Sequence, residues 1–207
     1  MPVLRRRMAC QPTSDYHRQS MTQLIEPETN RLRLRQWRAE DREPFAELNA
    51  DPRVREFFPD VLDRPGSDAL AQRLETFIVE HGWGLWAVEL KGSCDFIGFV
   101  GLCIPPAEIP YSPCVEVGWR LAHRYWGHGF ATEAARSALR AGFEGVGLGE
   151  IFSFTSILNE RSRAVMERLG MVEDADTFEH PNVPPGNRLR THCAYRISAD
   201  QWAASAE

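Results

Sequence analysis

Apolar and polar residues alternate along several short segments of the chain, as they do in half-buried β-strands. The alternation is strict over residues 31–37. Further extended segments lie at residues 85–90, 96–104, 115–121, 151–157, 172–179 and 191–197. The second and third segments flank a Lys-Gly-Ser turn, which predicts a hairpin. The pattern therefore predicts about seven strands.

Four other segments carry apolar residues at helical spacing, namely 41–51, 67–81, 131–144 and 160–169. Gly82 and Gly170 follow two of them, at the position where a left-handed C-cap is expected. Strands and helices follow one another as strand, two helices, several strands, then strand, helix, strand, helix and two final strands. This order predicts a mixed sheet of the α/β or α+β class with flanking helices and no internal repeats.

The length of 207 residues and a hydrophobic content of 43% suit one domain with a sizeable core. We expect residues 21–207 to form this domain and residues 1–20 to be a disordered extension, with either Met1 or Met21 as the start of translation. No stretch approaches the roughly 18 consecutive apolar residues of a membrane-spanning helix. No apolar run follows the N-terminal arginines, so a cytoplasmic location is expected.

The formal net charge of −5 makes the chain a poor non-specific ligand for nucleic acids or anionic membranes. We therefore expect neither as a partner, and any anionic ligand must be held by local geometry. The five cysteines are widely spread and include no Cys-x-x-Cys pair. This spacing argues against a disulfide framework and against a zinc site, so no metal is expected.

The most informative segment is residues 115–132, where a strand leads through Gly127 and Gly129 directly into an Ala-rich helix. Backbone N–H groups converge at the positive end of such a helix, and glycines allow a positive φ and close approach of an anion. The turn therefore favours a phosphate or pyrophosphate site, although a tight connection without a ligand explains it equally well. A P-loop or dinucleotide motif fits poorly, because the Gly-Lys-Ser/Thr and the third glycine are missing.

The same segment resembles the acetyl-coenzyme A loop of the GNAT N-acetyltransferase superfamily, specifically its RimJ/RimL-like branch. The resemblance lies in Glu116-Val117-Gly118-Trp119 and in Arg124-x-x-Gly127-x-Gly129-Phe130-Ala131. Residues 159–171 resemble the helix after the fifth strand of that branch, and residues 33–41 resemble its opening strand and helix. The resemblance spans about residues 25–197. It implies a GNAT fold and an acetyl-CoA-dependent N-acetyltransferase that acts on a primary amine by direct attack in a ternary complex.

The resemblance also implies where acetyl-CoA, the co-substrate, would bind. Its pyrophosphate would lie on the loop amides and its pantetheine arm along the preceding strand. The residues implied are Val117, Trp119, Leu121, Arg124, Trp126, Gly127, His128, Gly129, Phe130, Ala131 and Thr132. Asn159 would contact the pantetheine arm, and Ser162 would lie near the thiol as a candidate acid. From the pattern alone, Asn159 is the N-cap of its helix, and Arg124 and His128 are solvated loop residues.

The thioester oxygen would be bound by strand amides near Trp119, and a bulge near Gly118 would leave such amides free. Direct attack also needs a group that takes a proton, because an alkylammonium with a pKa of about 10.4 is almost wholly protonated at pH 7. Glu116, His192 and His180 are candidates, and a relay through water is equally consistent. For Glu116 the other interpretation is an exposed or salt-bridged strand residue.

Aromatic residues are candidates for the acceptor pocket: Phe57, Phe58, Trp83 and Trp86. His180 is a further substrate-binding candidate. At least two of the aromatic residues are expected to belong to the core instead. The acceptor would be a small amine or a protein N-terminus, and the acidic chain favours a cationic one. A non-catalytic CoA-binding or sensing module on the same fold is the alternative function, and a nucleotide-binding domain is a weaker one. Exposed strand edges are compatible with a homodimer.

Overall fold

The computed structural model describes residues 24–205, so the predicted extension at residues 1–20 and Met21 lie outside the described part of the chain. Seven strands in the described part form one sheet in the order β1-β2-β3-β4-β5-β7-β6. Their bounds are β1 Leu32–Arg35, β2 Leu85–Leu90, β3 Asp95–Cys103, β4 Glu116–Leu121, β5 Glu150–Ser156, β6 Val172–Glu179 and β7 Thr191–Ser198. Neighbouring strands are antiparallel except β4 and β5, which are parallel. The predicted mixed sheet is confirmed.

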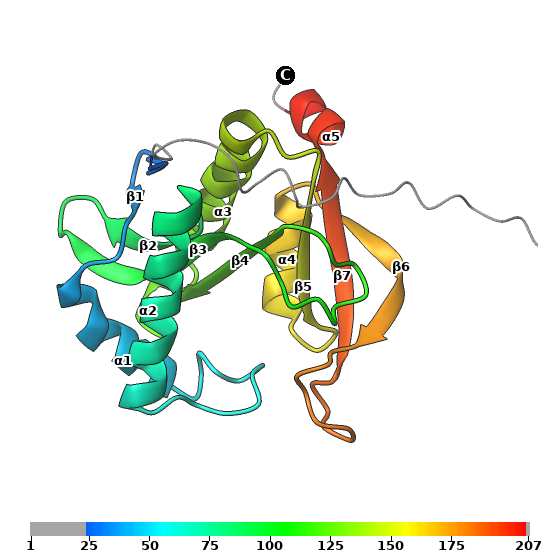
Figure 1. Cartoon of the computed structure of the whole chain (residues 1–207), viewed down its shortest axis with the longest axis horizontal. Helices are drawn as coiled ribbons and strands as arrows, with labels where there is room; N and C mark the ends of the chain where they lie inside the picture. The colour runs from blue at the N-terminus through cyan, green and yellow to red at the C-terminus, as the bar shows by residue number, and fades with distance from the viewer. Residues whose placement is uncertain (1–23, 206–207) are drawn as a thin grey trace, which may run out of the picture.

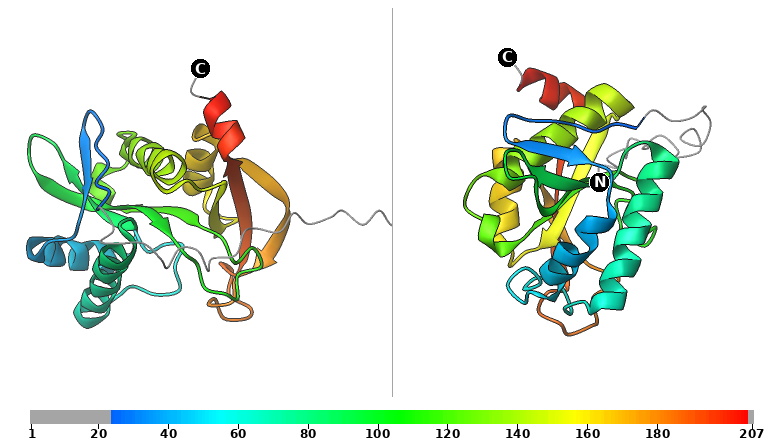
Figure 2. Two further views of the ribbon diagram at one scale, coloured as in Figure 1. Left: turned by 45° about the horizontal axis from the view of Figure 1, so that its top comes forward. Right: turned by 90° about the vertical axis from the view of Figure 1, so that its left-hand side faces the viewer.

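Helices cover both faces of this sheet. Their bounds are α1 Arg42–Ala50, α2 Arg64–His81, α3 Phe130–Arg140, α4 Glu160–Arg168 and α5 Ala199–Ala204. A π-helical turn, Ala141–Val146, continues α3, and short 3₁₀ turns at Ala39–Asp41 and His123–Tyr125 precede α1 and α3. Figures 1 and 2 show α1 and α2 against one face and α3 and α4 against the other. The sequence pattern did not predict α5, because six residues are too few to show a helical period.

Two predicted helix ends are present. Gly82 caps α2 with φ 77°, and its N–H donates to the Ile78 carbonyl at 2.8 Å. Gly170 follows α4 with φ 78°, and its N–H donates to the Glu167 carbonyl at 3.0 Å. Both glycines adopt the left-handed conformation that side chains with a Cβ disfavour, so these helix ends are determined locally.

The core lies between the sheet and the helices. Its largest fully buried side chains include Trp86, Tyr195, Phe45, Leu139, Ile151 and Met166. The indole N–H of Trp86 donates to the Ile25 carbonyl at 2.7 Å, and Trp83 is also buried. The structure thus corrects the prediction that Trp86 binds substrate, because it has no exposed surface. Alternation and aromatic character indicate that a residue prefers burial. They do not indicate which aromatic side chain faces a cavity after packing.

The sheet opens between β4 and β5. These strands pair at a single position, Glu116 opposite Phe152, where the Phe152 N–H donates to the Val115 carbonyl at 2.9 Å. β5 continues in antiparallel pairing with β7, while β4 follows β3, so the two strands diverge (Figure 1). The divergence leaves a crevice in the middle of the sheet.

An ion-pair network is buried at the other end of the sheet, between β1 and β2. The Arg35 guanidinium donates to both Asp41 oxygens at 2.7 and 2.9 Å and to Glu89 at 2.7 Å. All three residues are at most 4% exposed. Two carboxylates thus neutralise the arginine, as buried charges require.

No helix among residues 24–205 is long and apolar enough to cross a membrane.

Candidate active site

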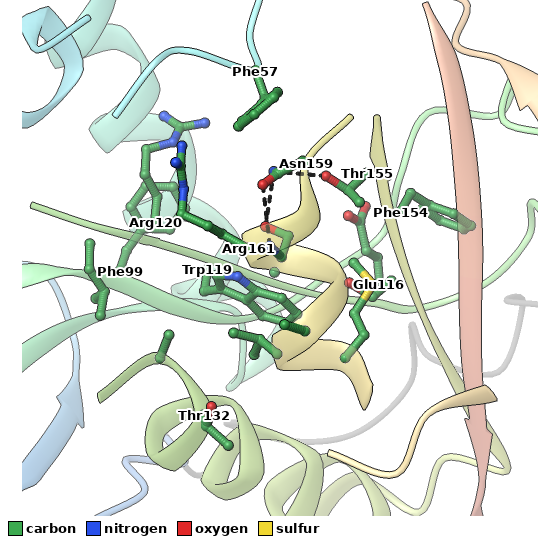
Figure 3. A pocket seen from close by; sticks show the side chains of 18 of the residues that line it. Phe57, Phe99, Glu116, Trp119, Arg120, Thr132, Phe154, Thr155, Asn159 and Arg161 are labelled. Atoms are coloured by element: carbon green, nitrogen blue, oxygen red, sulfur yellow. Dashed lines mark hydrogen bonds between the residues drawn. The ribbon is translucent and has the colours of Figure 1, made fainter. Parts of the chain in front are cut away.

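A cavity of about 1210 Å³ occupies the crevice between β4 and β5. Strands β3 to β5, helices α3 and α4, and the loop between α1 and α2 contribute to its wall (Figure 3). The predicted site residues that line it are Phe57, Phe58, Glu116, Trp119, Leu121, Trp126, Gly127, Gly129, Phe130, Ala131, Thr132, Asn159, Ser162, His180 and His192. The fold therefore brings segments that are far apart in the sequence to one cavity, large enough for an extended ligand.

Three of the predicted cofactor-binding residues do not line this cavity. The Val117 side chain is fully buried in the core. Arg124 and His128 are exposed, with their side chains against the rings of Tyr125 and Phe130. Arg124 and His128 lie in the turn before α3, as the motif predicted, but their side chains do not enter the cavity.

The turn before α3 has the backbone that its glycines suggested. Gly127 and Gly129 have φ values of 79° and 78°, and Gly129 is the N-cap of α3 without a side-chain cap. In the described part of the chain, no backbone acceptor takes a hydrogen bond from the N–H groups of residues 127–132, and Glu133 makes the first bond of the helix, to Gly129. Trp126 differs, because its N–H donates to the His123 carbonyl at 3.1 Å. The turn thus presents a set of free donors at a positive helix end.

Arg31, which the sequence analysis did not single out, braces this turn. Its Nη1 donates to the His128 carbonyl at 3.0 Å, and its guanidinium pairs with Glu133 at 2.6 Å and lies 4.5 Å from the Phe130 ring. No local signal could have identified it, because it reaches α3 only through the packing of the sheet.

The β4 edge beside the crevice carries unpaired backbone groups. The Ala122 N–H donates to Ile97 of β3, so by strand alternation Trp119 aims its N–H and C=O away from β3. Pairing with β5 has already ended at Glu116. The predicted bulge near Gly118 is absent, because the β3–β4 register is continuous there. Divergence of the strands, rather than a bulge, exposes the Trp119 amide.

Glu116 is half-buried in the cavity wall beside Phe154 (Figure 3). Burial raises its pKa to about 7, against the opposing effects of the Cys103 thiol and the Phe154 backbone N–H. The thiol sulfur lies 3.9 Å from Glu116 Oε2. A carboxylate with a pKa near neutrality can accept a proton and release it again at physiological pH.

His180 and His192 also line the cavity, with ring centroids 4.6 Å apart. Burial lowers the pKa of both rings, and the neighbouring His192 contributes to lowering that of His180 to about 4. Both rings are therefore neutral at pH 7. A lowered pKa makes each a weaker base than Glu116.

Asn159 and Ser162 lie together at the start of α4. Asn159 Oδ1 accepts from the Ser162 N–H at 3.2 Å, so the N-cap interpretation is confirmed. Its Nδ2 donates to Thr155 Oγ1 and to Ser162 Oγ, both at 3.0 Å (Figure 3). Both amide protons of Asn159 are thus used within the protein, and only Oδ1 has capacity for one more hydrogen bond.

Arg161 is a further wall residue that the sequence analysis did not single out. From α4 it pairs with Glu56 in the loop between α1 and α2. Its guanidinium lies 4.8 Å from the Trp126 ring and 5.3 Å from the Phe57 ring. Arg161 therefore links two elements on either side of the cavity.

Among residues 24–205, no group of three or more His, Cys, Asp or Glu side chains is arranged to hold a metal ion.

Comparison with known proteins identifies the family. The profile described as "Acetyltransferase (GNAT) domain" matches residues 31–172. FsC-acetyl coenzyme A-N(2)-transacetylase of Aspergillus fumigatus is 31% identical over 84% of this chain and 76% of its own length. A GNAT-family acetyltransferase from Bacillus anthracis superposes with a TM-score of 0.71 at 24% identity, over 85% of this chain and 99% of that one. An acetyltransferase from Agrobacterium tumefaciens superposes with a TM-score of 0.69 at 26% identity, over 87% and 98%. The chain therefore belongs to the GNAT acetyltransferase family, whose members use acetyl-CoA as co-substrate, and it is an N-acetyltransferase.

Proposed function

We propose that this protein moves the acetyl group of acetyl-CoA to a primary amine by direct attack in a ternary complex, in the cytoplasm, and that it belongs to the RimJ/RimL-like branch. The observation that carries the proposal is the set of free N–H groups at residues 127–132, at the mouth of the β4–β5 crevice. A diphosphate is the anionic ligand such a turn accommodates best, because several N–H groups and the helix dipole act on it together. The name of the Aspergillus relative, an N(2)-transacetylase, supports a nitrogen acceptor.

The crevice edge of β4 supports the position of the acyl group. The unpaired N–H and C=O of Trp119 would pair with the amides of the pantetheine arm as a neighbouring strand would. An N–H there would also stabilise the negative charge that develops on the thioester oxygen. Ser162 Oγ accepts from Asn159, and its own proton has no acceptor among the described residues. That proton is free to be donated to the departing sulfur.

Glu116 would accept the proton that the attacking amine loses, directly or through one water. Its position on β4, two residues before Gly118, places it beside the unpaired part of the strand. The pKa of about 7 supports the choice of Glu116 over His180 and His192, whose pKa values are lowered.

The turn is tested by replacing both Gly127 and Gly129 with valine. By calorimetry, we expect acetyl-CoA to bind the wild-type protein saturably. The affinity of the double variant should be at least about hundredfold lower, because valine disfavours the positive φ that orients the N–H groups. Gly147→Val is the matched control, because Gly147 has a φ of 80° at the end of the π-helical turn and does not line the cavity. Its affinity should stay that of the wild type.

Unchanged affinity in the Gly127→Val/Gly129→Val variant would contradict the proposed turn. Release of free thiol with a panel of amines then tests transfer itself. Binding without thiol release from any amine would favour the non-catalytic CoA-binding module over the enzyme.

A further inference from the structure

Arg120 is a cation in the cavity wall that has no carboxylate partner among the described residues. Its Nη1 donates to Asn49 Oδ1 at 2.8 Å, and Asn49 is fully buried with its own amide donating to Ser67 Oγ at 3.0 Å. The Nε atom of Arg120 is buried and has no hydrogen-bond partner. A neutral amide therefore fixes one end of the guanidinium and leaves the Nε side unsatisfied.

The contrast with Arg35 shows that this arrangement is unusual within the same chain. Arg35 also extends from a strand and is buried, and there Asp41 and Glu89 neutralise it. Leaving a desolvated charge unpaired costs several kcal/mol in general, so unpaired buried cations are uncommon where no ligand completes them.

The surroundings of Arg120 add positive charge instead of removing it. Its guanidinium lies 4.1 Å from the Phe58 ring and 5.0 Å from the Phe99 ring. The Arg55 guanidinium lies 4.3 Å from the same Phe58 ring, and it too forms no ion pair within the described residues. Burial, followed by the charge of Arg55, lowers the pKa of Arg120 to about 9. Arg120 is therefore still charged at neutral pH.

We propose that Arg120, with Phe58 beside it in the cavity wall, forms a subsite for a carboxylate of the acceptor, so that the substrate is an amine that also carries a carboxylate. This inference rests on the proposed function. The Nε–Nη2 edge is the side of a guanidinium that binds a carboxylate through two parallel hydrogen bonds. A carboxylate bound there would supply the acceptor that Nε lacks.

The phosphates of acetyl-CoA are not the expected occupant. Arg120 contacts Asn49 of α1 and the loop that follows α1. The free N–H groups proposed for the diphosphate lie at the start of α3, and α1 and α3 cover opposite faces of the sheet (Figure 2). The subsite is thus on the side from which an acceptor would approach the thioester.

The position of Glu116 limits the length of the acceptor. Glu116 and Arg120 lie four residues apart on one face of β4, which corresponds to about 13 Å between their Cα atoms. Figure 3 shows their side chains on opposite sides of the cavity. In a bound acceptor, the amine would face Glu116 and the carboxylate would bind Arg120. Several bonds must therefore separate the amine from the carboxylate. This spacing fits an ω-amino acid better than an α-amino acid.

The test compares 6-aminohexanoate with its neutral carboxamide, 6-aminohexanamide, as acceptors. In the wild type, we expect kcat/KM to be about tenfold or more higher for the carboxylate than for the carboxamide. Only the carboxylate can neutralise the Arg120 guanidinium while accepting its hydrogen bonds. Arg120→Met should remove this preference by raising KM for the carboxylate, with the carboxamide and the affinity for acetyl-CoA little changed. Arg140→Met, which changes an exposed arginine outside the cavity, is the control and should keep the preference.

Equal preference in the wild type and Arg120→Met would overturn the subsite, and so would a wild-type preference for the carboxamide. Should neither compound be acetylated, thermal unfolding in the presence of CoA is the second readout. The carboxylate should then raise the Tm of the wild type but not of Arg120→Met, and no such shift would overturn the inference. Arg120→Gln, which can still donate to Asn49, replaces the methionine variant if that variant does not fold.

These outcomes are separable from those of the proposed function. Thiol release with a neutral amine but no carboxylate preference would reject the subsite alone. Failure of the wild-type protein to bind acetyl-CoA would reject the proposed function itself.

Discussion

At the scale of single residues, the environment of a side chain decides its chemistry. Glu116 and Glu89 are both strand carboxylates, yet their pKa values move in opposite directions. Burial raises the pKa of Glu116, since no cation pairs with it in the described part of the chain. Burial also acts on Glu89, but the bond with Arg35 and the charges of neighbouring arginines outweigh it and lower the pKa. One carboxylate is therefore suited to proton transfer and the other to structure.

The raised pKa of Glu116 predicts the pH dependence of catalysis. We expect kcat to rise with pH through an apparent pKa of about 7, because only the ionised carboxylate accepts a proton. Glu116→Gln should lower kcat by roughly 10²- to 10⁴-fold and remove this part of the profile. Initial rates from about pH 5 to 9 at saturating substrates provide the measurement.

His192→Asn is the control for this profile. The pKa of His192 is lowered, so its replacement should leave the rise of kcat near pH 7 in place. If the rise disappeared in His192→Asn and persisted in Glu116→Gln, the histidine would be the base and our assignment would be wrong.

At the scale of elements, the start of α4 combines a structural and a functional position. Asn159 holds the first turn of the helix through Ser162, and Ser162 lines the cavity. The hydrogen bonds from Asn159 to Thr155 and Ser162 also tie α4 to the end of β5. The position of the Ser162 hydroxyl therefore depends on the cap.

Replacing this cap predicts a measurable loss of stability. Asn159→Ala should lower the free energy of unfolding by about 1 kcal/mol, because the Ser162 N–H loses its acceptor. Asn159→Asp is the matched variant, since it keeps the acceptor and should stay within about 0.5 kcal/mol of the wild type. Urea unfolding monitored by circular dichroism measures both. Equal losses in the two variants would mean that the amide donors, not the cap, stabilise α4.

At the scale of the whole molecule, the sheet carries a buried ion-pair network at one end and is open in the middle. The network of Arg35, Asp41 and Glu89 joins β1, β2 and the turn before α1. The crevice between β4 and β5 interrupts the pairing of the same sheet. The cavity thus lies where the pairing of the sheet is interrupted.

Removing the central arginine of this network should be costly. Arg35→Met is expected to lower the free energy of unfolding by about 3–5 kcal/mol at pH 7, because the buried Asp41 loses its ion-pair partner and the buried Glu89 keeps only the more exposed arginines beside it. In the wild type, the pKa of Glu89 lies below its ordinary value of 4.5. Ionised Glu89 therefore stabilises the folded protein at pH values above 4.5, and this stabilisation is lost as the pH falls through the lowered pKa. Urea unfolding at pH 7 and pH 4 tests both effects.

Arg140→Met, at an exposed ion pair with an N–O distance of 3.9 Å, should change the stability by less than about 0.5 kcal/mol. A similar cost for Arg140→Met and Arg35→Met would show that burial of the network does not determine its contribution.

The sequence by itself determined the elements and the turn before α3. Strand alternation, the caps at Gly82 and Gly170, and the positive φ of Gly127 and Gly129 depend on residues close together in the chain, so each could be predicted locally. The resemblance then identified which segments would meet at one site.

Only the tertiary structure decided which side chains face the cavity and what surrounds them. Trp86 belongs to the core while Phe57 and Phe58 line the cavity, although all three are aromatic. Arg31 contacts the turn before α3, and Arg120 contacts α1, although these segments lie far from them in the sequence. Burial, the pairing of charges and the divergence of β4 from β5 are properties of packing between distant segments, and a local pattern carries no information on that packing.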